Sequence, residues 1–573
     1  MSRNTGVDYI MTNMMKAAQE QLREMLMQAM GKLVAEGKIP AEVLPAFRIE
    51  VPADKTHGDF SSNIAMASAK ALHMPPRKIA ELLIEAFYFQ GSYFERAETA
   101  GPGFLNFFLQ KNWFSDTVQA ILNEKEEYGK SEDGKGKKAL VEFVSANPTG
   151  PMHVGNARGA ALGDGIASLL EWTGWHTERE FYINDAGNQI EKFATSLEVR
   201  YLQKCGKNIE MPEDAYHGAD ITAHAENFYA ENGDKFADTD SKSRRDALVA
   251  FALPKNIAGL ERDLKSYRVE YDNWFSESTL HQNGAVMEIV RKLTDKGYTY
   301  EQEGAVWFKA EQFGADKDFV LVRANGIPTY IVPDIAYHCD KLVTRNFDKA
   351  INVLGADHHG YVPRLKAALK ALDVDTDKLD VVLMQMVILL RNGEVAKLSK
   401  RSGKAIGLVT LLEDIPLDAA RFFFNMREAN SHFEFDLDLA VEKTSQNPVY
   451  YVQYAHARIC SILRTLQEEN LYREGTPLKE LPAPETQQEI ELIRHLAGFP
   501  AEISAAAKVY DPSRITKYAL ELANLYHKFY DACSVKNAET PELREFRTDL
   551  CRAAGQVLRN AMAILKIDCP EKM

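Results

Sequence analysis

The stretch Val144-Ser-Ala-Asn-Pro-Thr-Gly-Pro-Met-His-Val-Gly-Asn-Ala-Arg-Gly159 decides the fold of this chain. It follows the apolar run Ala139-Leu-Val-Glu-Phe-Val144, which predicts a buried strand, and it leads into a predicted helix from about Gly155 to Trp172. A strand, a glycine-containing turn and a helix N-terminus in this order are typical of a nucleotide-binding α/β unit, because the first amides of the helix favour an anionic phosphate. The stretch therefore predicts an α/β fold.

Short apolar runs further along the chain extend this pattern. They lie at Ala305–Phe308, Phe319–Arg323, Ala350–Leu354 and Val381–Leu390, with segments of helical pattern between them. This alternation predicts that the runs join the first strand in one parallel sheet. The polar and charged segment at about 200–275 interrupts the series, and we expect it to be a helical insertion.

The flanking regions predict two further domains. Residues 1–112 begin with a helical pattern and end in Ala100-Gly-Pro-Gly-Phe-Leu-Asn-Phe-Phe-Leu109, where a glycine-proline turn leads into a strand, so an α+β domain is expected. The α/β domain is expected to span residues 113–440, and the charged segment 124–138 within it is interpreted as a linker or exposed loop without an apolar anchor. Residues 441–573 show only helical patterns, which predicts an all-helical bundle.

Composition excludes several classes of protein. The chain has 573 residues, of which 45% are hydrophobic and 26% charged, as in a packed soluble protein rather than a disordered or fibrous one. The apolar run Val381–Leu390 is too short to cross a bilayer, and the N-terminus shows no secretory pattern, so we expect a cytoplasmic protein without a membrane partner. Six scattered cysteines without a C-x-x-C pair argue against a disulfide framework and against cysteine-bound zinc. A net charge of −14 argues against indiscriminate binding to nucleic acid, and no DNA partner is expected.

The first candidate site lies in the turn before the predicted helix. Gly155 allows the backbone to approach a ligand closely, and His153 can donate a hydrogen bond to phosphate oxygens as charge develops in a transition state. For the four residues from His153 to Asn156 alone, a turn with a surface histidine is the simpler interpretation. The preceding strand, the two prolines and the long helix favour a phosphate site.

The second candidate site is Arg391-Asn-Gly-Glu-Val-Ala-Lys-Leu-Ser-Lys-Arg-Ser-Gly-Lys404, with five basic residues and one acidic residue. The interspersed glycines predict a flexible cationic loop rather than a packed element. Such a loop suits the stabilisation of charge on a transferring or leaving phosphate. In isolation, a solvated basic loop is an equally good interpretation.

Together, His153-Val-Gly-Asn156 and Lys397-Leu-Ser-Lys-Arg401 resemble the paired "HIGH" and "KMSKS" motifs of class I aminoacyl-tRNA synthetases. The pair, in the right order and on an α/β background, is much more specific than either part. Six further segments resemble the arginyl-tRNA synthetase family of bacterial type and extend the resemblance over nearly the whole chain: Gly58–Ala65, Ala100–Asn106, Tyr330–Ala336, Leu354–Tyr361, Phe435–Leu439 and Asn447–Arg458.

The resemblance implies a Rossmann-like catalytic domain, an N-terminal domain that contacts tRNA and a C-terminal helical domain that binds the anticodon. It implies that L-arginine reacts with ATP to give arginyl-adenylate and pyrophosphate, and that arginine then passes to the terminal adenosine of tRNA(Arg). ATP would enter with Mg²⁺ as a substrate complex, and no tightly bound metal or organic cofactor is expected. A monomer that needs tRNA before it activates arginine is also implied.

The resemblance assigns the chemistry to the two motifs. His153 and Asn156 would hold the ATP phosphates, and Lys397 and Lys400 would stabilise the pentavalent transition state, so these four are the expected catalytic residues. Asn156 stands where the family usually has histidine, but its amide can still donate a hydrogen bond. The full set expected to bind ATP is His153, Gly155, Asn156, Lys397, Ser399 and Lys400.

The side chain of arginine would be selected by Tyr330 and Asp334. In the family, the aspartate pairs with the guanidinium and the tyrosine flanks it, which fits the planar fork of that group. The spacing of four in a predicted strand-to-helix turn lets both side chains face one pocket. The alternative is that Tyr330 belongs to the core and that Asp334 caps a helix beginning at Ile335.

Four more residues are expected at the arginine site: Glu142, Ser145, Asn147 and His358. The first three lie at the end of the first predicted strand, where side chains open into the crevice of an α/β sheet. Glu142 could equally pair with a neighbouring basic side chain. The segment Asp357-His358-His359 has no third ligand nearby in sequence, so contact with arginine or adenosine is preferred over a metal site.

For tRNA, the resemblance places anticodon contacts at Tyr450, Gln453, Tyr454 and Arg458, close to Tyr451 and His456. Aromatic faces stack on unstacked bases, and amide or guanidinium groups bind base edges. The alternative is that these tyrosines, which recur at helical spacing, are partly core residues. Tyr526, His527, Lys528 and Tyr530 form a second group of this kind.

The motif pair alone also fits functions other than arginine–tRNA ligation. A synthetase for another amino acid and a nucleotidyltransferase without tRNA specificity both fit the motif pair, but Tyr330, Asp334 and the full-length resemblance speak against them. An inactive RNA-binding paralogue would have no need of His153, Gly155, Lys397 and Lys400. Turnover of ATP with arginine would separate these functions.

Overall fold

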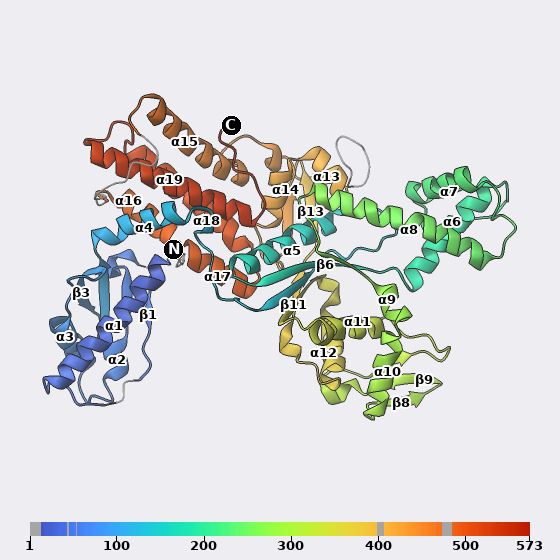
Figure 1. Ribbon diagram of the computed structural model, residues 1–573, viewed down its shortest axis with the longest axis horizontal. Helices are drawn as coiled ribbons and strands as arrows, with labels where there is room; N and C mark the ends of the chain where they lie inside the picture. Colours follow the sequence, from blue (N-terminus) through green and yellow to red (C-terminus); the bar gives the residue numbers. More distant parts are fainter. Residues whose placement is uncertain (1–12, 43–44, 53, 398–405, 473–483) are drawn as a thin grey trace, which may run out of the picture.

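The computed structural model describes residues 13–42, 45–52, 54–397, 406–472 and 484–573. Figure 1 shows a central α/β region, an N-terminal module at one end, a layer of C-terminal helices above the sheet and a helical arm at the opposite end. In the described ranges, no helix is long and apolar enough to span a membrane.

The centre of the fold is a sheet of five parallel strands in the order β12-β11-β5-β6-β7. The strands are β5 (Lys138–Glu142), β6 (His176–Ile183), β7 (Asn273–Ser276), β11 (Lys349–Gly355) and β12 (Leu379–Met384). The chain moves outward from β5 through β6 to β7 and then returns to the other side of β5 with β11. The carboxyl ends of β5 and β11 therefore flank a topological switch point, where α/β sheets bind ligands. The predicted α/β class is confirmed.

The expectation of a single parallel sheet for all the apolar runs is wrong. β9 (Ala305–Phe308) and β10 (Phe319–Val322) form a separate antiparallel sheet with β8 (Thr299–Gln302). The two-residue turn Glu303-Gly304, with φ of 52° and 74°, closes the β8–β9 hairpin, because such turns match the twist of antiparallel strands. The run Val381–Leu390 divides between β12 and β13 (Val387–Arg391), and β13 pairs with β14 (Glu394–Val395) and β15 (Phe433–Asp436).

Helices cover the central sheet and extend it. The helix after β5 is α5 (Val154–Trp172), within one residue of the prediction. The arm seen in Figure 1 consists of α6 (Asn188–Lys204), α7 (Ala219–Asn232) and α8 (Ser241–Ser266), which share a small core of their own. A second core lies beside the β8–β10 sheet, among α9 (Glu277–Gln282), α10 (Ala285–Asp295), α11 (Ile331–Cys339) and α12 (Val362–Ala371).

The N-terminal module packs α1 (Met14–Ala35), α2 (Ile64–Ser68) and α3 (Pro76–Ala86) with an antiparallel sheet in the order β1-β2-β4-β3. The strands are β1 (Ile49–Glu50), β2 (Phe60–Ser62), β3 (Phe94–Ala100) and β4 (Phe104–Leu109). The predicted α+β character is confirmed. α4 (Lys111–Glu124) leaves this module and packs against the C-terminal helices.

The segment after α4 is anchored, contrary to its interpretation as a linker or exposed loop. Tyr128 is fully buried, and its hydroxyl donates a hydrogen bond to the carbonyl of Leu496 at 3.0 Å. Its ring stacks on Phe499 at a centroid distance of 6.4 Å. This contact depends on one aromatic side chain among charged neighbours. The charged composition of the segment therefore gave no sign of the anchor.

The C-terminal region is helical, as predicted, and no strand follows Asp436 within the described ranges. Helices α13 (Leu408–Asp414) and α14 (Leu417–Phe424) precede β15. The helices that follow it are α15 (Pro448–Glu468), α16 (Gln487–Ala497), α17 (Phe499–Val509), α18 (Ser513–Ala532) and α19 (Pro541–Ile564). α15, α18 and α19 pack against one another, and α17 packs against α5 of the catalytic region.

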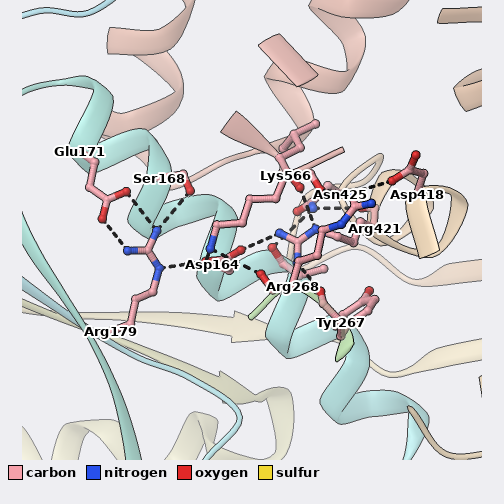
Figure 2. A network of polar contacts seen from close by, with 12 residues as sticks. Asp164, Ser168, Glu171, Arg179, Tyr267, Arg268, Asp418, Arg421, Asn425 and Lys566 are labelled. Carbon is pink, nitrogen blue, oxygen red and sulfur yellow. Dashed lines mark hydrogen bonds and ion pairs between the residues drawn. The ribbon is translucent and has the colours of Figure 1, made fainter. Parts of the chain in front are cut away.

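A buried polar network joins α5 to the C-terminal region (Figure 2). Asp164 on α5 accepts from Arg179 Nε at 2.8 Å, from Lys566 Nζ at 2.8 Å and from Arg421 Nη2 at 2.6 Å. Burial opposes the ionisation of Asp164, but these cations outweigh it and hold its pKa below the usual value. The ion pairs of this one carboxylate therefore connect β6, α14 and the segment after α19 to α5, the helix that begins at the first motif.

Candidate active site

The first motif forms the N-terminal cap of α5. The backbone N–H of Gly155 donates to His153 Nδ1 at 3.1 Å, and the backbone N–H of His153 donates to Asn156 Oδ1 at 3.0 Å. Because Nδ1 accepts, the proton of the neutral imidazole resides on Nε2. His153 Nε2 and the amide nitrogen of Asn156 are therefore the donors that these capping bonds leave for an anion at the helix N-terminus.

The strand end before this motif is strained. Val144 and Ser145 have φ of 68° and 41°, and a β-branched residue rarely adopts such a conformation. Residues held in this way cost about 1–3 kcal/mol each and cluster at functional sites. The turn directs the Ser145 hydroxyl back to the sheet, where it donates to Glu142 Oε1 at 3.1 Å and accepts from the backbone N–H of Tyr182 at 3.1 Å.

Glu142 pairs with a buried lysine, as the alternative interpretation of this residue proposed. Lys341 Nζ lies 2.6 Å from Glu142 Oε2, and the side chains of Lys341 and Glu142 are 0% and 8% exposed. Lys341 also donates to Asn352 Oδ1 at 3.2 Å. Sequence reasoning missed this lysine because it lies 199 residues away, in a segment without a recognised motif.

A cleft of about 660 Å³ opens at the carboxyl edge of the central sheet. It brings together Ser145 and Asn147 from the strand end, His153 and Asn156 from the first motif, and His358 from the segment after β11. Tyr216 and Asp220, which precede and begin α7 in the helical arm, line its opposite side. The sequence assigned no role to this contribution from the arm.

Asp334 and Tyr330 lie at the start of α11. For both residues the structure contradicts the alternative interpretation, in which Tyr330 is a core residue and Asp334 a helix cap. Tyr330 is 72% exposed rather than core, and α11 begins at Ile331, so Asp334 lies within its first turn rather than at a cap. The hydroxyl of Tyr361 donates a hydrogen bond to Asp334 Oδ2. The Tyr361 ring stacks near Tyr330 at 6.0 Å and meets the His358 ring edge-on at 6.2 Å. Tyr361 therefore connects the two parts of the predicted arginine site, and only its position in a matched segment hinted at this.

The electrostatics at Asp334 favour a cationic ligand. Burial raises the pKa of Asp334 to about 6, the negative charges of Glu142 and Glu277 add to the shift, and the Tyr361 hydrogen bond and Lys341 oppose it. A cation that binds beside Asp334 would stabilise the ionised carboxylate. Glu277, in the first turn of α9, was not identified from the sequence.

The second motif begins on a hairpin, which corrects the expectation of a loop throughout 391–404. β13 and β14 pair across the tight turn Asn392-Gly393, whose φ values are 51° and 76°. An asparagine-glycine pair between strands is the usual signal for such a turn. Lys397 follows this hairpin and is exposed, whereas Ser399 and Lys400 lie outside the described residues.

The first motif contacts the segment that follows the second motif. His153 and Gly407 form an antiparallel backbone bridge, and the N–H of Leu408 donates to the carbonyl of Met152 at 3.1 Å. The carbonyl of Lys397 accepts from the N–H of Ile406 at 3.3 Å, so Lys397 lies close to the residue before Gly407. A Cβ at Gly407 would lie 2.5 Å from the Met152 carbonyl oxygen, so glycine permits the close approach.

The predicted anticodon residues are only partly together. Tyr450 and Tyr454 stack at 6.3 Å on α15, and Tyr454 is 44% exposed. Arg458 Nη1 contacts His527 Nδ1 at 3.2 Å and lies over the Tyr530 ring. Gln453, in contrast, donates to Asp418 Oδ2 and to the carbonyl of Asp568, each at 2.9 Å, in the contact between α15, α14 and the end of the chain.

Two neighbours of these residues are structural. His456 is buried and lies 3.0 Å from the carbonyl of Pro570, and Tyr526 is fully buried beside α19. Tyr451 is partly buried against His527 at a ring distance of 5.0 Å. No cluster of three or more histidine, cysteine or acidic residues suited to a metal ion occurs in the part of the chain that the structure describes.

The parallel sheet, the crevice at its carboxyl edge and the first motif at the N-terminus of α5 are features of a class I aminoacyl-tRNA synthetase. A family model for "tRNA synthetases class I (R), catalytic domain" matches residues 117–460. Models for the arginyl-tRNA synthetase N-terminal domain and the DALR anticodon-binding domain match residues 19–109 and 452–573. The chain therefore belongs to the arginyl-tRNA synthetase family.

Curated relatives agree with this assignment. The arginine–tRNA ligase of Acetivibrio thermocellus is 51% identical over 565 residues, which cover 98% of this chain and 100% of the relative. The arginine–tRNA ligase of Caldanaerobacter subterraneus subsp. tengcongensis is 50% identical, with coverage of 98% and 100%. Thermus thermophilus arginyl-tRNA synthetase has the same fold, with a TM-score of 0.71, 23% identity and coverage of 97% and 100%. The protein is an arginine–tRNA ligase.

Proposed function

We propose that His153, Asn156, Lys397 and Lys400 form arginyl-adenylate from L-arginine and the Mg²⁺ complex of ATP. The observation that supports this proposal is the backbone bridge between His153 and Gly407, because Gly407 follows the second motif closely in sequence and lies beside the N-terminus of α5. Gly155 and Ser399 complete the set that binds ATP.

The reaction needs no protein nucleophile. The carboxylate oxygen of arginine attacks the α-phosphorus of ATP, a bond forms between them, and pyrophosphate leaves with the electrons of the broken P–O bond. His153 Nε2 and the Asn156 amide donate hydrogen bonds to phosphate oxygens, and the amides of α5 favour their negative charge. Lys397 and Lys400 stabilise the charge on the transferring and leaving groups. Catalysis is positioning together with electrostatic stabilisation.

Two groups of side chains bind arginine in this proposal. Asp334 accepts the guanidinium and Tyr330 flanks it, while Glu142, Ser145 and Asn147 contact the α-amino group and the guanidinium end, and His358 contacts arginine or the adenosine of ATP. Glu142 contacts Ser145 and Lys341, but a carboxylate has about four lone-pair sites, so a further donor can bind. If lysine bound in place of arginine, the acceptors that pair with the guanidinium would be left without a partner, at a cost of about 1–3 kcal/mol for each buried group.

Transfer of arginine to the terminal adenosine of tRNA(Arg) completes the reaction. The exposed ring of Tyr454 and the half-buried ring of Tyr450, with Arg458 beside them, are a surface on which anticodon bases can stack. We place Gln453 in the same interface, although its amide contacts Asp418 in the free protein. The enzyme acts as a cytoplasmic monomer with domains at residues 1–112, 113–440 and 441–573, and it needs tRNA to activate arginine.

Arginine-dependent exchange of pyrophosphate into ATP tests this proposal, run with and without total tRNA and with lysine as the control amino acid. The expected result is exchange with arginine only, and only when tRNA is present. Rapid exchange without tRNA would contradict the tRNA requirement. Exchange with lysine at a comparable rate would contradict the role of Tyr330 and Asp334.

A further inference from the structure

The helical arm of α6, α7 and α8 reaches the turn that leads into the first motif, and the proposed mechanism does not use this contact. The turn, residues 146–152, runs from the strained end of β5 to His153 at the start of α5, and Asn147 lies near its beginning. Pro148 and Thr149 near its centre are buried. The position of this turn therefore sets the position of two side chains, Asn147 and His153, to which the mechanism assigns substrate contacts.

Two hydrogen bonds from other elements reach this turn in the described part of the chain. The N–H of Leu408 donates to the carbonyl of Met152 at 3.1 Å, at the end of the turn. The side-chain amide of Asn256, on α8, donates to the carbonyl of Pro148 at 2.9 Å. The bond from Leu408 holds the turn where it meets α5, whereas the bond from Asn256 holds it next to Asn147.

The orientation of the Asn256 amide is fixed from its other side. His224, on α7, places Nε2 at 2.6 Å from Asn256 Oδ1. Because an amide oxygen can only accept, Nε2 carries the proton of this bond, and the amide nitrogen remains for the carbonyl of Pro148. The hydrogen bonds of His224 and Asn256 thus join both α7 and α8 to the turn.

The arm also packs against the turn beside these bonds. Ile221, on α7, is 0% exposed and lines the cleft together with Asp220 and Gly150. A Cβ at Gly150 would lie 3.8 Å from Asp220 Oδ2, which is an ordinary van der Waals distance, so α7 and the turn are neighbours here. Because the arm has a core of its own, it offers the turn a packed support.

A bond of this kind should matter more for the rate than for folding. One hydrogen bond between neutral groups contributes little to the stability of a protein, because the same groups bind water in the unfolded chain. A misplacement of about 1 Å in an active site, in contrast, can lower the rate about a hundredfold. The contact between Asn256 and Pro148 is therefore best assessed through catalysis.

We propose that Asn256 is a positioning residue for adenylate formation. Its amide holds the turn 146–152 in the place where Asn147 and His153 face the reacting groups, so the helical arm takes part in the reaction without touching a substrate through Asn256. The inference rests on the proposed function, in which Asn147 contacts arginine and His153 holds the ATP phosphates.

The test compares wild type, Asn256→Leu and Asn232→Leu in arginine-dependent pyrophosphate exchange with tRNA. Asn232 is the matched control, because its amide also donates to a backbone carbonyl, that of Phe228 at 3.1 Å, but at the end of α7 opposite to Asp220. For Asn256→Leu we expect kcat to fall about tenfold or more, with KM values for ATP and arginine within about threefold of wild type, since misplaced groups lose most in the transition state. Asn232→Leu should keep kcat within about twofold of wild type.

Asn256→Asp isolates the bond to the turn. Its carboxylate can still accept from His224 but cannot donate to Pro148, so kcat should fall as it does in Asn256→Leu. Thermal unfolding reports whether each variant is folded, and Asn256→Asp decides if Asn256→Leu is not.

A kcat within about twofold of wild type in a folded Asn256 variant would overturn the inference, as would an equal fall of kcat in Asn232→Leu. Absence of arginine-dependent exchange in the wild type would instead contradict the proposed function itself.

Discussion

The backbones of His153 and Gly407 pair as an antiparallel bridge. This bridge joins the N-terminus of α5 to the base of the second motif, although the two residues are far apart in sequence. The bond between Leu408 and Met152 extends the contact by one residue. Main-chain contacts therefore hold the segment that follows the second motif against the N-terminus of α5.

Gly407→Ala should impair adenylate formation with little effect on folding. The new Cβ would lie 2.5 Å from the Met152 carbonyl oxygen, so the backbone must move and the bridge between Gly407 and His153 is disturbed. We expect the exchange rate to fall about tenfold or more, since small misplacements are costly in catalysis. Gly31→Ala is the matched control, because that position in α1 is open, and it should retain full activity. A fully active Gly407→Ala enzyme would refute the role of the bridge.

The affinity for arginine should weaken at acidic pH through Asp334. Its pKa of about 6 means that the carboxyl group is protonated below this pH, and a neutral carboxyl group cannot pair with the guanidinium, which keeps its charge. The KM for arginine should therefore be constant at neutral pH and rise by up to about tenfold per pH unit well below pH 6.

Steady-state exchange across this pH range, with the KM for ATP as the internal control, checks the prediction. Asp334→Asn should bind arginine weakly at every pH and lose the acidic increase in KM. If the KM for arginine of Asp334→Asn rose by the same amount at acidic pH, the increase would have to come from the titration of another group.

Asp164→Asn should destabilise the protein. The substitution leaves Arg179, Arg421 and Lys566 around a neutral, buried side chain, and breaking a buried ion pair from one side costs about 3–5 kcal/mol. Urea unfolding followed by fluorescence measures the effect. Asp568→Asn is the control, because that carboxylate is 72% exposed in its pair with Arg268 and should contribute about 1 kcal/mol or less. Equal stabilities of the two variants would be inconsistent with the network in Figure 2.

The stability contributed by Asp164 should also depend on pH. Its folded-state pKa lies below the unfolded value of 3.8, so this contribution is fully present at higher pH and is lost as the pH falls through the lowered pKa. The difference in stability between wild type and Asp164→Asn should accordingly shrink in strong acid. A difference that stayed constant down to this range would contradict the cited shift.

Tyr454→Ala should weaken the use of tRNA without affecting the small substrates. Loss of one stacked base costs about 1–3 kcal/mol, so the KM for tRNA(Arg) in aminoacylation should rise about five- to 150-fold. The KM values for ATP and arginine serve as controls and should stay within about twofold of wild type. If the KM for tRNA(Arg) were unchanged, the exposed face of α15 would not carry the anticodon contact.

The sequence predicts best what is local. The strand, turn and helix around His153 are encoded in consecutive residues, and the structure places α5 within one residue of the prediction. The sheet to which a strand belongs is not encoded locally, because an apolar run such as Ala305–Phe308 does not show which strand it will pair with. In the structure, the tight turn after β8 pairs this run with β8.

The supporting side chains of the site were the hardest to predict. Lys341 and Tyr361 act on Glu142 and Asp334, but each comes from a distant segment, and a lone lysine or tyrosine carries no spacing signal. The same holds for Asp164 and its cations. Burial of a charge is a tertiary property, and the residues that compensate it become apparent only when the chain is folded.

The measurement that tests the central claim most directly compares how a substitution in the first motif and one on α11 change the KM for ATP and the KM for arginine. Exchange kinetics with tRNA would compare Asn156→Ala at the first motif with Asp334→Asn on α11, varying ATP and arginine independently. The account predicts that Asn156→Ala impairs the use of ATP and leaves the KM for arginine unchanged, whereas Asp334→Asn raises the KM for arginine and leaves that for ATP unchanged. The reverse pattern, or equal effects of both variants on both substrates, would contradict the assignment of the site.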